Sequence, residues 1–240
     1  MKTIIELRNV HKNYGKIEAL KGISLSINEG EIYGIVGPNG SGKTTLLRII
    51  CGLIKPTRGE VRVLGLNPYV YFDETRRYIG YLPEEADTYD LLSGFEHLHL
   101  YAKLYNLDTE DIKYGVELAA LDNRIYDLTR GYSKGMKRRL LLALVLMRKP
   151  KVALLDEPTA GLDVHTSLKI RRAIKKYVKE TGASVIISSH NMLEIEEVCD
   201  RVGLIFKGKI VAEGTVEELL GKYSARNLEE VFETVTGEVS

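Results

Sequence analysis

Short runs of branched apolar residues alternate with stretches of helical periodicity over much of the chain. Near the N-terminus the runs are separated by glycine-containing turns, a pattern that predicts strands. After residue 148, apolar runs alternate with segments in which apolar residues recur every three or four positions. This alternation predicts a parallel sheet with helices on its faces. The predicted strands are 4–9, 24–27, 31–36, 60–64, 152–155, 184–188 and 201–206, and the helices predicted between them are 43–50, 164–179 and 191–198.

The stretch from about residue 73 to 148 has a different pattern and predicts an inserted helical unit. Segments 93–105 and 109–121 both carry apolar residues at helical spacing. The apolar run 140–147 is bounded by basic residues and is shorter than the about 20 residues that a membrane-spanning helix needs, so it predicts a buried helix. We therefore expect an α/β core of about residues 1–83 and 149–220, a helical subdomain of about 84–148, and a helical tail at 221–240.

Composition and charge narrow the class of protein further. The 240 residues include 34 Lys+Arg and 33 Asp+Glu, a net charge of +1, which gives no support for nucleic-acid binding driven by bulk basicity. Cys51 and Cys199 are far apart and form no C-x-x-C pair, so neither a disulfide framework nor a zinc site is indicated. An acid, Glu6, precedes any signal-peptide core. We expect a cytosolic protein without a nucleic-acid partner.

The strongest candidate site is a glycine-rich segment between a predicted strand and a predicted helix. Residues 37–44 read GPNGSGKT and fit G-x-x-x-x-G-K-[ST] at every fixed position. The glycines let successive backbone N–H groups turn toward a phosphate, and the helix start adds the positive end of its dipole. Lys43 would bring positive charge to the β- and γ-phosphates, and Thr44 a hydroxyl to Mg²⁺. The candidate phosphate-binding residues are Gly37, Pro38, Asn39, Gly40, Ser41, Gly42, Lys43, Thr44 and Thr45.

An acid pair, Asp156 and Glu157, ends the predicted strand 152–155. A buried parallel strand would deliver Asp156 at its carboxyl end, where ligands of open α/β sheets bind. One acid beside Mg²⁺ and a second able to activate a water suit phosphoryl transfer. Alone, an apolar strand followed by Asp-Glu is more often just a strand end. Combined with residues 37–44, it indicates a P-loop nucleotidase.

Two further stretches distinguish among P-loop proteins. Asp-Glu-Pro-Thr-Ala-Gly-Leu-Asp at 156–163 is followed by Ser-Ser-His at 188–190, and Tyr-Ser-Lys-Gly-Met at 132–136 precedes the acidic strand. This ordered set, within about residues 4–220, resembles the ATP-binding subunits of ATP-binding cassette (ABC) transporters. The resemblance implies an α/β fold: a P-loop NTPase core with a mostly parallel sheet, an N-terminal antiparallel β region and an inserted α-helical subdomain.

The resemblance also implies roles for residues that would surround a nucleotide. Asp156 matches the Mg²⁺-holding aspartate of the family, and Glu157 matches the general base that polarises the attacking water. His190 matches the switch histidine that contacts the γ-phosphate. Tyr14 matches the aromatic residue that stacks on adenine, although it is one of 14 tyrosines and can also be read as an ordinary strand-end residue.

Other matched residues imply a second copy of the chain. Ser133 and Gly135 match the helix start that meets the γ-phosphate bound by a partner subunit, and Asp163 matches the loop that communicates across that dimer. Ser133 is also a plausible N-cap, and a helix cap followed by a cationic face is compatible with this function. That cationic face comprises Lys134, Lys137, Arg138 and Arg139.

Two departures from the family pattern coincide with the absence of glutamine from the chain. Glu84 stands where many members have glutamine, and 132–136 reads Tyr-Ser-Lys-Gly-Met where Leu-Ser-Gly-Gly-Gln is usual. Both variants resemble the branch that drives exporters of the ABC-2 class. Glu84 can accept a hydrogen bond from metal-bound water, so we group it with Thr44 and Asp156 as candidate metal residues.

The resemblance implies an ATPase that binds ATP and Mg²⁺, dimerises around two ATP and powers a separate transmembrane permease, for export. Such a subunit would be peripheral on the inner face of the cell membrane, with a permease helix docked near residues 81–89. The alternative is a soluble ABC-type ATPase with a non-membrane partner such as an iron–sulfur assembly scaffold. A P-loop kinase or GTPase would leave 133–136 and 188–190 unexplained. The sequence leaves the transported substrate and the permease open.

Overall fold

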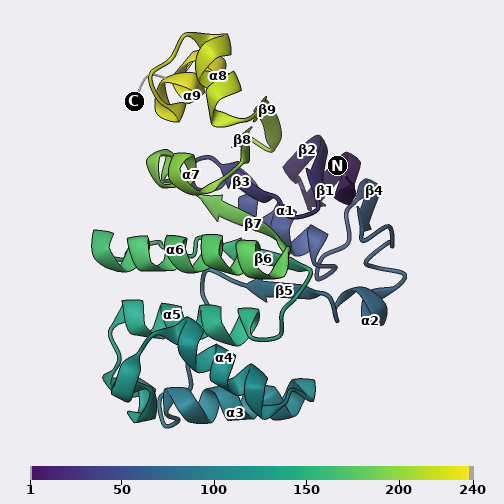
Figure 1. The fold of residues 1–240 in the computed structure, drawn as a ribbon. Coiled ribbons are helices and arrows are strands. Elements are labelled where there is room, and N and C mark those ends of the chain that lie inside the picture. The colour runs from purple at the N-terminus through teal and green to yellow at the C-terminus, as the bar shows by residue number, and fades with distance from the viewer. Residues whose placement is uncertain (1, 238–240) are drawn as a thin grey trace.

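The computed structural model describes residues 2–237 and contains two β-sheets with an α-helix between them (Figure 1). Within those residues, the larger sheet consists of β5 (Ile79–Leu82), β6 (Val152–Asp156), β7 (Ser184–Ser189), β3 (Ile32–Val36), β8 (Arg201–Phe206) and β9 (Lys209–Gly214), in that spatial order. All of its neighbouring strands pair in parallel except β9, which is antiparallel to β8. The smaller sheet is antiparallel, with the order β2 (Ile17–Asn28), β1 (Thr3–Tyr14) and β4 (Arg58–Val63).

The helices fall into three groups along the described chain. The core group consists of α1 (Lys43–Ile50), α6 (Val164–Thr181) and α7 (Met192–Val198). The inserted group, between β5 and β6, consists of α3 (Gly94–Tyr105), α4 (Thr109–Ala119), two short 3₁₀ helices (Asp122–Tyr126 and Thr129–Gly131) and α5 (Lys134–Leu146). The short α2 (Phe72–Thr75) precedes β5, and α8 (Val216–Tyr223) and α9 (Leu228–Thr236) follow β9. Figure 1 shows the inserted group at one end of the molecule and α8 and α9 at the other.

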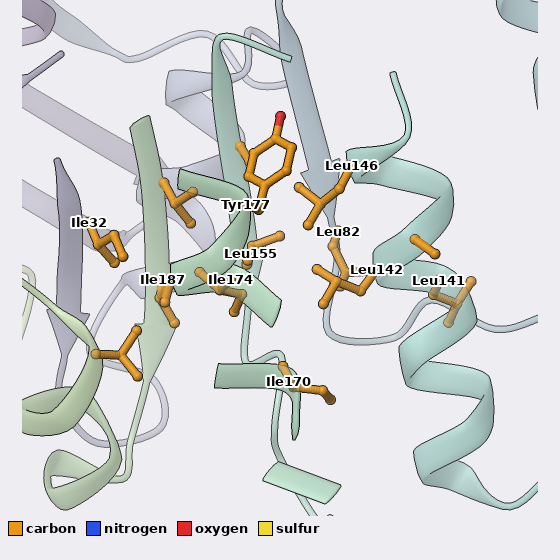
Figure 2. Close-up of a cluster of buried hydrophobic side chains, with 14 of the residues drawn as sticks. Ile32, Leu82, Leu141, Leu142, Leu146, Leu155, Ile170, Ile174, Tyr177 and Ile187 are labelled. Carbon is orange, nitrogen blue, oxygen red and sulfur yellow. The ribbon is translucent and has the colours of Figure 1, made fainter. Parts of the chain in front are cut away.

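Residues of the central strands alternate between two hydrophobic clusters because successive side chains of a strand point to opposite faces. On β6, Val152 and Leu154 join the cluster around α1, whereas Ala153 and Leu155 join the cluster beneath α5 and α6. Figure 2 shows this second cluster, in which Leu155 lies among side chains of both helices. Burial on both faces explains why β6 reads as a continuous apolar run.

The inserted helices begin at residues whose side chains satisfy free backbone N–H groups. Ser93 caps α3 and Asp108 caps α4, each with a reciprocal capping box. At α5 the cap is Ser133, whose Oγ accepts a hydrogen bond from the Met136 N–H at 3.3 Å. The cap places the start of α5 immediately after residue 133, as the sequence predicted.

The predicted fold class is confirmed, but the stretch 73–148 is not wholly helical. Residues 79–82 form β5, which pairs in parallel with β6. This strand was missed because it has four residues and is formed through its pairing rather than a long apolar pattern. Strand β9 was missed too, and β1 and β2 are longer than predicted.

The predicted tail, 221–240, packs against the core as far as it is described. Leu228 and Val231 of α9 are fully buried in the cluster beneath the larger sheet, and residues 238–240 lie outside the described part. Helix α8 spans residue 220, so the expected boundary falls within a helix. No helix within residues 2–237 is long and apolar enough to cross a membrane.

Replacing Gly34 by alanine tests the close packing of α7 on β3. An added Cβ would lie 2.7 Å from Ile195 Cγ2 and 3.0 Å from Cys199 Sγ, so these side chains would have to move. We expect the free energy of unfolding, measured by urea denaturation, to fall by about 1–3 kcal/mol. Gly221→Ala in α8 is the control, because nothing lies within 4 Å of its added Cβ and alanine favours the helix. Unchanged stability of Gly34→Ala would contradict this packing.

Candidate nucleotide-binding site

The glycine-rich segment forms a tight loop between β3 and α1. Gly42 caps α1 with a φ of 113°, a conformation that L side chains rarely adopt. At Gly37 an added Cβ would lie only 2.1 Å from the backbone oxygen of Ile205. Glycine is therefore required at both positions by the fold itself, in addition to any contact with a phosphate.

Lys43 is held inside this loop. Its Nζ donates hydrogen bonds to the backbone oxygens of Gly37, at 2.7 Å, and Pro38, at 3.2 Å. Its side chain is 6% exposed and forms an ion pair with Glu157, with 3.2 Å between Nζ and Oε1. The ammonium therefore lies between the loop and the acid pair, where an anionic ligand of the loop would meet it.

Asp156 lies at the carboxyl end of β6 and is fully buried. Its Oδ1 accepts a hydrogen bond of 2.5 Å from Ser188 Oγ, and its Oδ2 accepts one of 3.4 Å from Tyr81 OH. Burial and the nearby Asp156 charge raise the pKa of Tyr81 to about 12, so this phenol is a donor at neutral pH. These contacts from β7 and β5 fix the orientation of the Asp156 carboxylate.

Glu157 has a backbone conformation that is unusual for a residue with a side chain. Its φ is 48°, in the left-handed region, where strained residues cluster at functional sites. Its N–H donates to Ser188 Oγ at 3.0 Å. The carboxylate is 4% exposed and lies between two cationic or polar groups, with Oε2 2.9 Å from Nδ1 of the half-exposed His190. The structure thus brings Lys43, Glu157 and His190 together.

A pocket of about 320 Å³ opens beside these groups. Glu84 lines it, which places this departure from the family pattern at the same site as Glu157. The remaining lining residues are Ala19, Asn39, Gly40, Gly42, Lys43, Thr44 and Thr45. The buried Ser41 Oγ, part of the same loop, has no hydrogen-bond partner within the described chain, as suits a group adjoining a phosphate site.

The residues around this pocket suit Mg²⁺ bound together with phosphate better than a metal ion whose ligands are all protein side chains. Among the described residues, no cluster of three or more His, Cys, Asp and Glu side chains could hold a metal ion. Mg²⁺ is ordinarily bound by one or two protein oxygens together with phosphate and water. The Thr44 hydroxyl and the carboxylates of Asp156 and Glu84 supply oxygen donors of this kind.

Nine predicted residues do not line the pocket. Five of them belong to segments that adjoin it: Gly37, Pro38, Ser41, Asp156 and His190. The other four, Tyr14, Ser133, Gly135 and Asp163, lie on other segments. Tyr14, at the end of β1, is 45% exposed, with Lys12 Nζ 5.0 Å from its ring centre. Ser133 is exposed at the start of α5, and Gly135 packs so closely on α6 that an added Cβ would lie 2.7 Å from Thr166 Cγ2. Asp163 caps α6 by accepting from the Thr166 N–H at 3.0 Å. The starts of α5 and α6 therefore adjoin each other outside this pocket, and Lys134 of α5 lines a neighbouring hollow together with Glu84 and Glu157.

Sequence reasoning missed the contacts of two residues near the acid pair. Ser188, in the Ser-Ser-His stretch, bridges Asp156 and Glu157. This contact depends on the register of β6 and β7, for which the sequence carries no signal. Arg138 was placed on a cationic helix face, yet its side chain is 7% exposed and donates to backbone oxygens of both acids. Helical spacing could not reveal that burial.

Comparisons with known proteins agree with this geometry. The family model described as "ABC transporter" matches residues 20–160. The uncharacterized ABC transporter ATP-binding protein YhcH of Bacillus subtilis is 41% identical over 212 residues, which cover 88% of this chain and 70% of that protein. The bacitracin transport ATP-binding protein BcrA of Bacillus licheniformis is 37% identical over 214 residues, covering 89% and 70%.

Solved structures with the same fold include ATP-binding cassettes in dimeric form. A dimeric post-hydrolysis state of MJ0796 bound to ADP and Pi superposes with a TM-score of 0.77 and 30% identity, covering 88% of this chain and 98% of that one. An ATP-binding subunit of an ABC transporter gives a TM-score of 0.86 at 25% identity, covering 98% and 100%. The family match includes the loop after β3 and extends past the acid pair of β6. This chain therefore belongs to the ABC transporter family as an ATP-binding subunit with ATPase activity.

Proposed function

We propose that two copies of this chain close around two ATP and two Mg²⁺ ions, and that hydrolysis drives a separate membrane permease. The observation that carries the proposal is the position of Glu157, buried between Lys43 and His190 at the edge of the pocket. Arriving phosphates would draw Lys43 toward them and free the Glu157 carboxylate to accept a proton from the attacking water.

The proposed Mg²⁺ contacts follow from the oxygen donors in and beside the pocket. Thr44 and Asp156 would hold the ion directly, and Glu84 would accept a hydrogen bond from its water. When bound, the ion would neutralise phosphate charge. Ser188 and Tyr81 keep the Asp156 carboxylate oriented.

Dimerisation is supported by the surface position of the start of α5. Ser133 is exposed and lies outside the pocket lining. A nucleotide bound in the pocket would therefore leave Ser133 free to contact another molecule. A two-fold dimer would place each Ser133 and Gly135 on the γ-phosphate of the partner subunit, where the helix N-terminus favours negative charge. Asp163, beside them on α6, would lie at the same interface.

A groove of about 600 Å³ beside Tyr81 suits a permease helix. It extends toward α2 and the end of α3 rather than along 82–89. Its walls combine apolar, aromatic and cationic side chains: Cys51, Leu53, Phe72, Arg76, Arg77, Ile79, Tyr81, Leu104, Tyr105 and Arg148, with Asn106. A helix seated there would touch Tyr81, which contacts the Asp156 carboxylate.

Export is the proposed direction of transport. The relative BcrA carries bacitracin transport in its name, and Glu84 and 132–136 resemble the ABC-2 exporter branch. A soluble scaffold in place of the permease would instead support the iron–sulfur alternative.

Removing the Lys43 ammonium should weaken ATP binding. Lys43→Ala deletes charge-assisted hydrogen bonds to the phosphates, each worth about 1.5–3 kcal/mol, so we expect affinity to fall about 10- to 100-fold or more. Titration calorimetry of Mg-free ATP measures the change. Lys169→Ala, on the exposed face of α6, is the matched control. Unaltered affinity of Lys43→Ala would overturn the phosphate-loop assignment.

Neutralising Glu157 should separate ATP binding from hydrolysis. Glu157→Gln keeps the size of the side chain but removes the base, so turnover should fall by about 10²-fold or more while ATP still binds. The ATP-bound dimer should then accumulate in size-exclusion chromatography with Mg²⁺. Glu117→Gln, exposed on α4, should behave as the wild type. A monomeric variant with normal turnover would contradict both the catalytic role and the dimer.

Reversing a charge in the groove should release the permease without affecting the pocket. Arg77 is exposed and lines the groove, so Arg77→Glu should abolish co-purification of a multi-spanning polypeptide from detergent-solubilised membranes. ATP affinity should stay unchanged, as it should in Arg172→Glu on the exposed side of α6, which should also retain the partner. Recovery of only a soluble scaffold with the wild type would refute the transporter assignment.

A further inference from the structure

Arg138 is a buried cation that contacts both loops bearing the pocket acids. It belongs to the second turn of α5, and its side chain is 7% exposed. Burial lowers the pKa of the guanidinium, and the charges of Asp156, Glu84 and Glu157 oppose that effect. A buried guanidinium is costly unless its donors are satisfied, so the identity of its acceptors indicates what it does.

The acceptors are backbone oxygens on two separate loops. Nη1 donates to Pro83 O at 2.9 Å and to Glu84 O at 3.3 Å, in the loop that follows β5. Nη2 donates to Asp156 O at 2.6 Å and to Glu157 O at 3.0 Å, at the end of β6. Nε donates to the next residue of that loop, Pro158 O, at 3.1 Å. One planar group thus ties α5 to the loops of both pocket acids.

This arrangement supports the strained turn at Glu157. A non-glycine residue in the left-handed region costs about 1–2 kcal/mol, and surrounding contacts must hold it there. Ser188 accepts from the Glu157 N–H on one side. On the other, Arg138 binds the carbonyls of Asp156, Glu157 and Pro158. The direction of the Glu157 carboxylate therefore depends on both contacts.

We propose that Arg138 is a positioning residue for ATP hydrolysis. It sets the backbone from which Glu157 and Glu84 reach the pocket, and it links that backbone to α5, the helix that Ser133 caps. In the dimer of the proposed function, on which this step rests, the start of α5 meets the partner's nucleotide. Arg138 would then couple the positions of Glu157 and Glu84 in one subunit to the closure of that subunit on its partner. Its side chain acts through the backbone and does not touch the nucleotide.

The neighbouring arginine provides a matched control. Arg139 is partly buried on the same helix and donates to the backbone oxygens of Ala119 at 3.3 Å and Ala120 at 2.5 Å, at the end of α4. It makes the same kind of contact with backbone carbonyls, but inside the helical insert. Arg138→Gln and Arg139→Gln therefore remove the same kind of contact at different places, five hydrogen bonds in the first case and two in the second.

The test compares kcat, KM for ATP, ATP affinity and dimer formation in the full chain. Arg138→Gln should lower kcat about tenfold or more while KM and the calorimetric affinity stay within about threefold, and the ATP-bound dimer should persist. Arg138→Lys should also lose activity, because a single ammonium lacks the planar fork that reaches both loops. Arg139→Gln should keep the wild-type kcat even if its thermal stability falls.

Three results would overturn the proposal: an unchanged kcat in Arg138→Gln, full rescue by Arg138→Lys, or a loss of ATP affinity matching the loss of kcat. The last would identify a merely structural contact. Failure of the wild type to hydrolyse ATP, or of Glu157→Gln to form an ATP-bound dimer, would instead count against the proposed function. The two failures are therefore distinguishable.

Discussion

The buried ion pair between Lys43 and Glu157 is the contact on which the site depends. Both side chains are almost inaccessible to water, and their attraction across 3.2 Å counters part of the cost of burying each charge. Each follows a different strand, β3 or β6, and β7 lies between these strands in the sheet. The sheet order therefore creates the pair from distant segments, and β7 adds Ser188 and His190 at the same edge.

Local constraints explain which parts of the site were predictable. Backbone conformation and close approach at Gly37 and Gly42 restrict the loop at 37–44 to glycine at these positions. The conformation of the loop was therefore predictable from its sequence. The burial of residues 152–155 was predictable in the same way, because all four are apolar. The contact of Ser188 with Asp156 was not readable, because it needs the register that sets those two residues opposite each other on β7 and β6.

Other features arose only from tertiary packing. Strand β5 is four residues long and, within residues 2–237, pairs only with β6 in its sheet. Four residues are too few to show the alternation of apolar and polar positions that predicts a strand. The sequence placed Arg138 on a cationic helix face. Its burial results from hydrogen bonds to the carbonyls of two loops that are distant from it in the sequence. The structure also shows where one of the missing glutamines would have stood, since Glu84 lines the pocket with Glu157.

The acid pair is contacted from two sides of the molecule. Tyr81 reaches the Asp156 carboxylate from the groove beside α2 and α3, and Arg138 reaches the backbone of both acids from α5. Movement of either region would change the orientation of groups at the pocket. In the proposed assembly, this is how a permease in the groove and a partner subunit at α5 would both influence one hydrolytic site.

The proposal that each ATP site is shared between two subunits is tested most directly by mixing two inactive variants. Lys43→Ala removes the ammonium from the phosphate loop and Ser133→Arg blocks the start of α5, so neither variant should hydrolyse ATP alone. In an equal mixture, half the randomly paired dimers would contain both variants, each with one intact site, and turnover should rise to roughly a quarter of the wild-type rate. Turnover equal to the mean of the separate variants at every mixing ratio would contradict a site shared between two subunits.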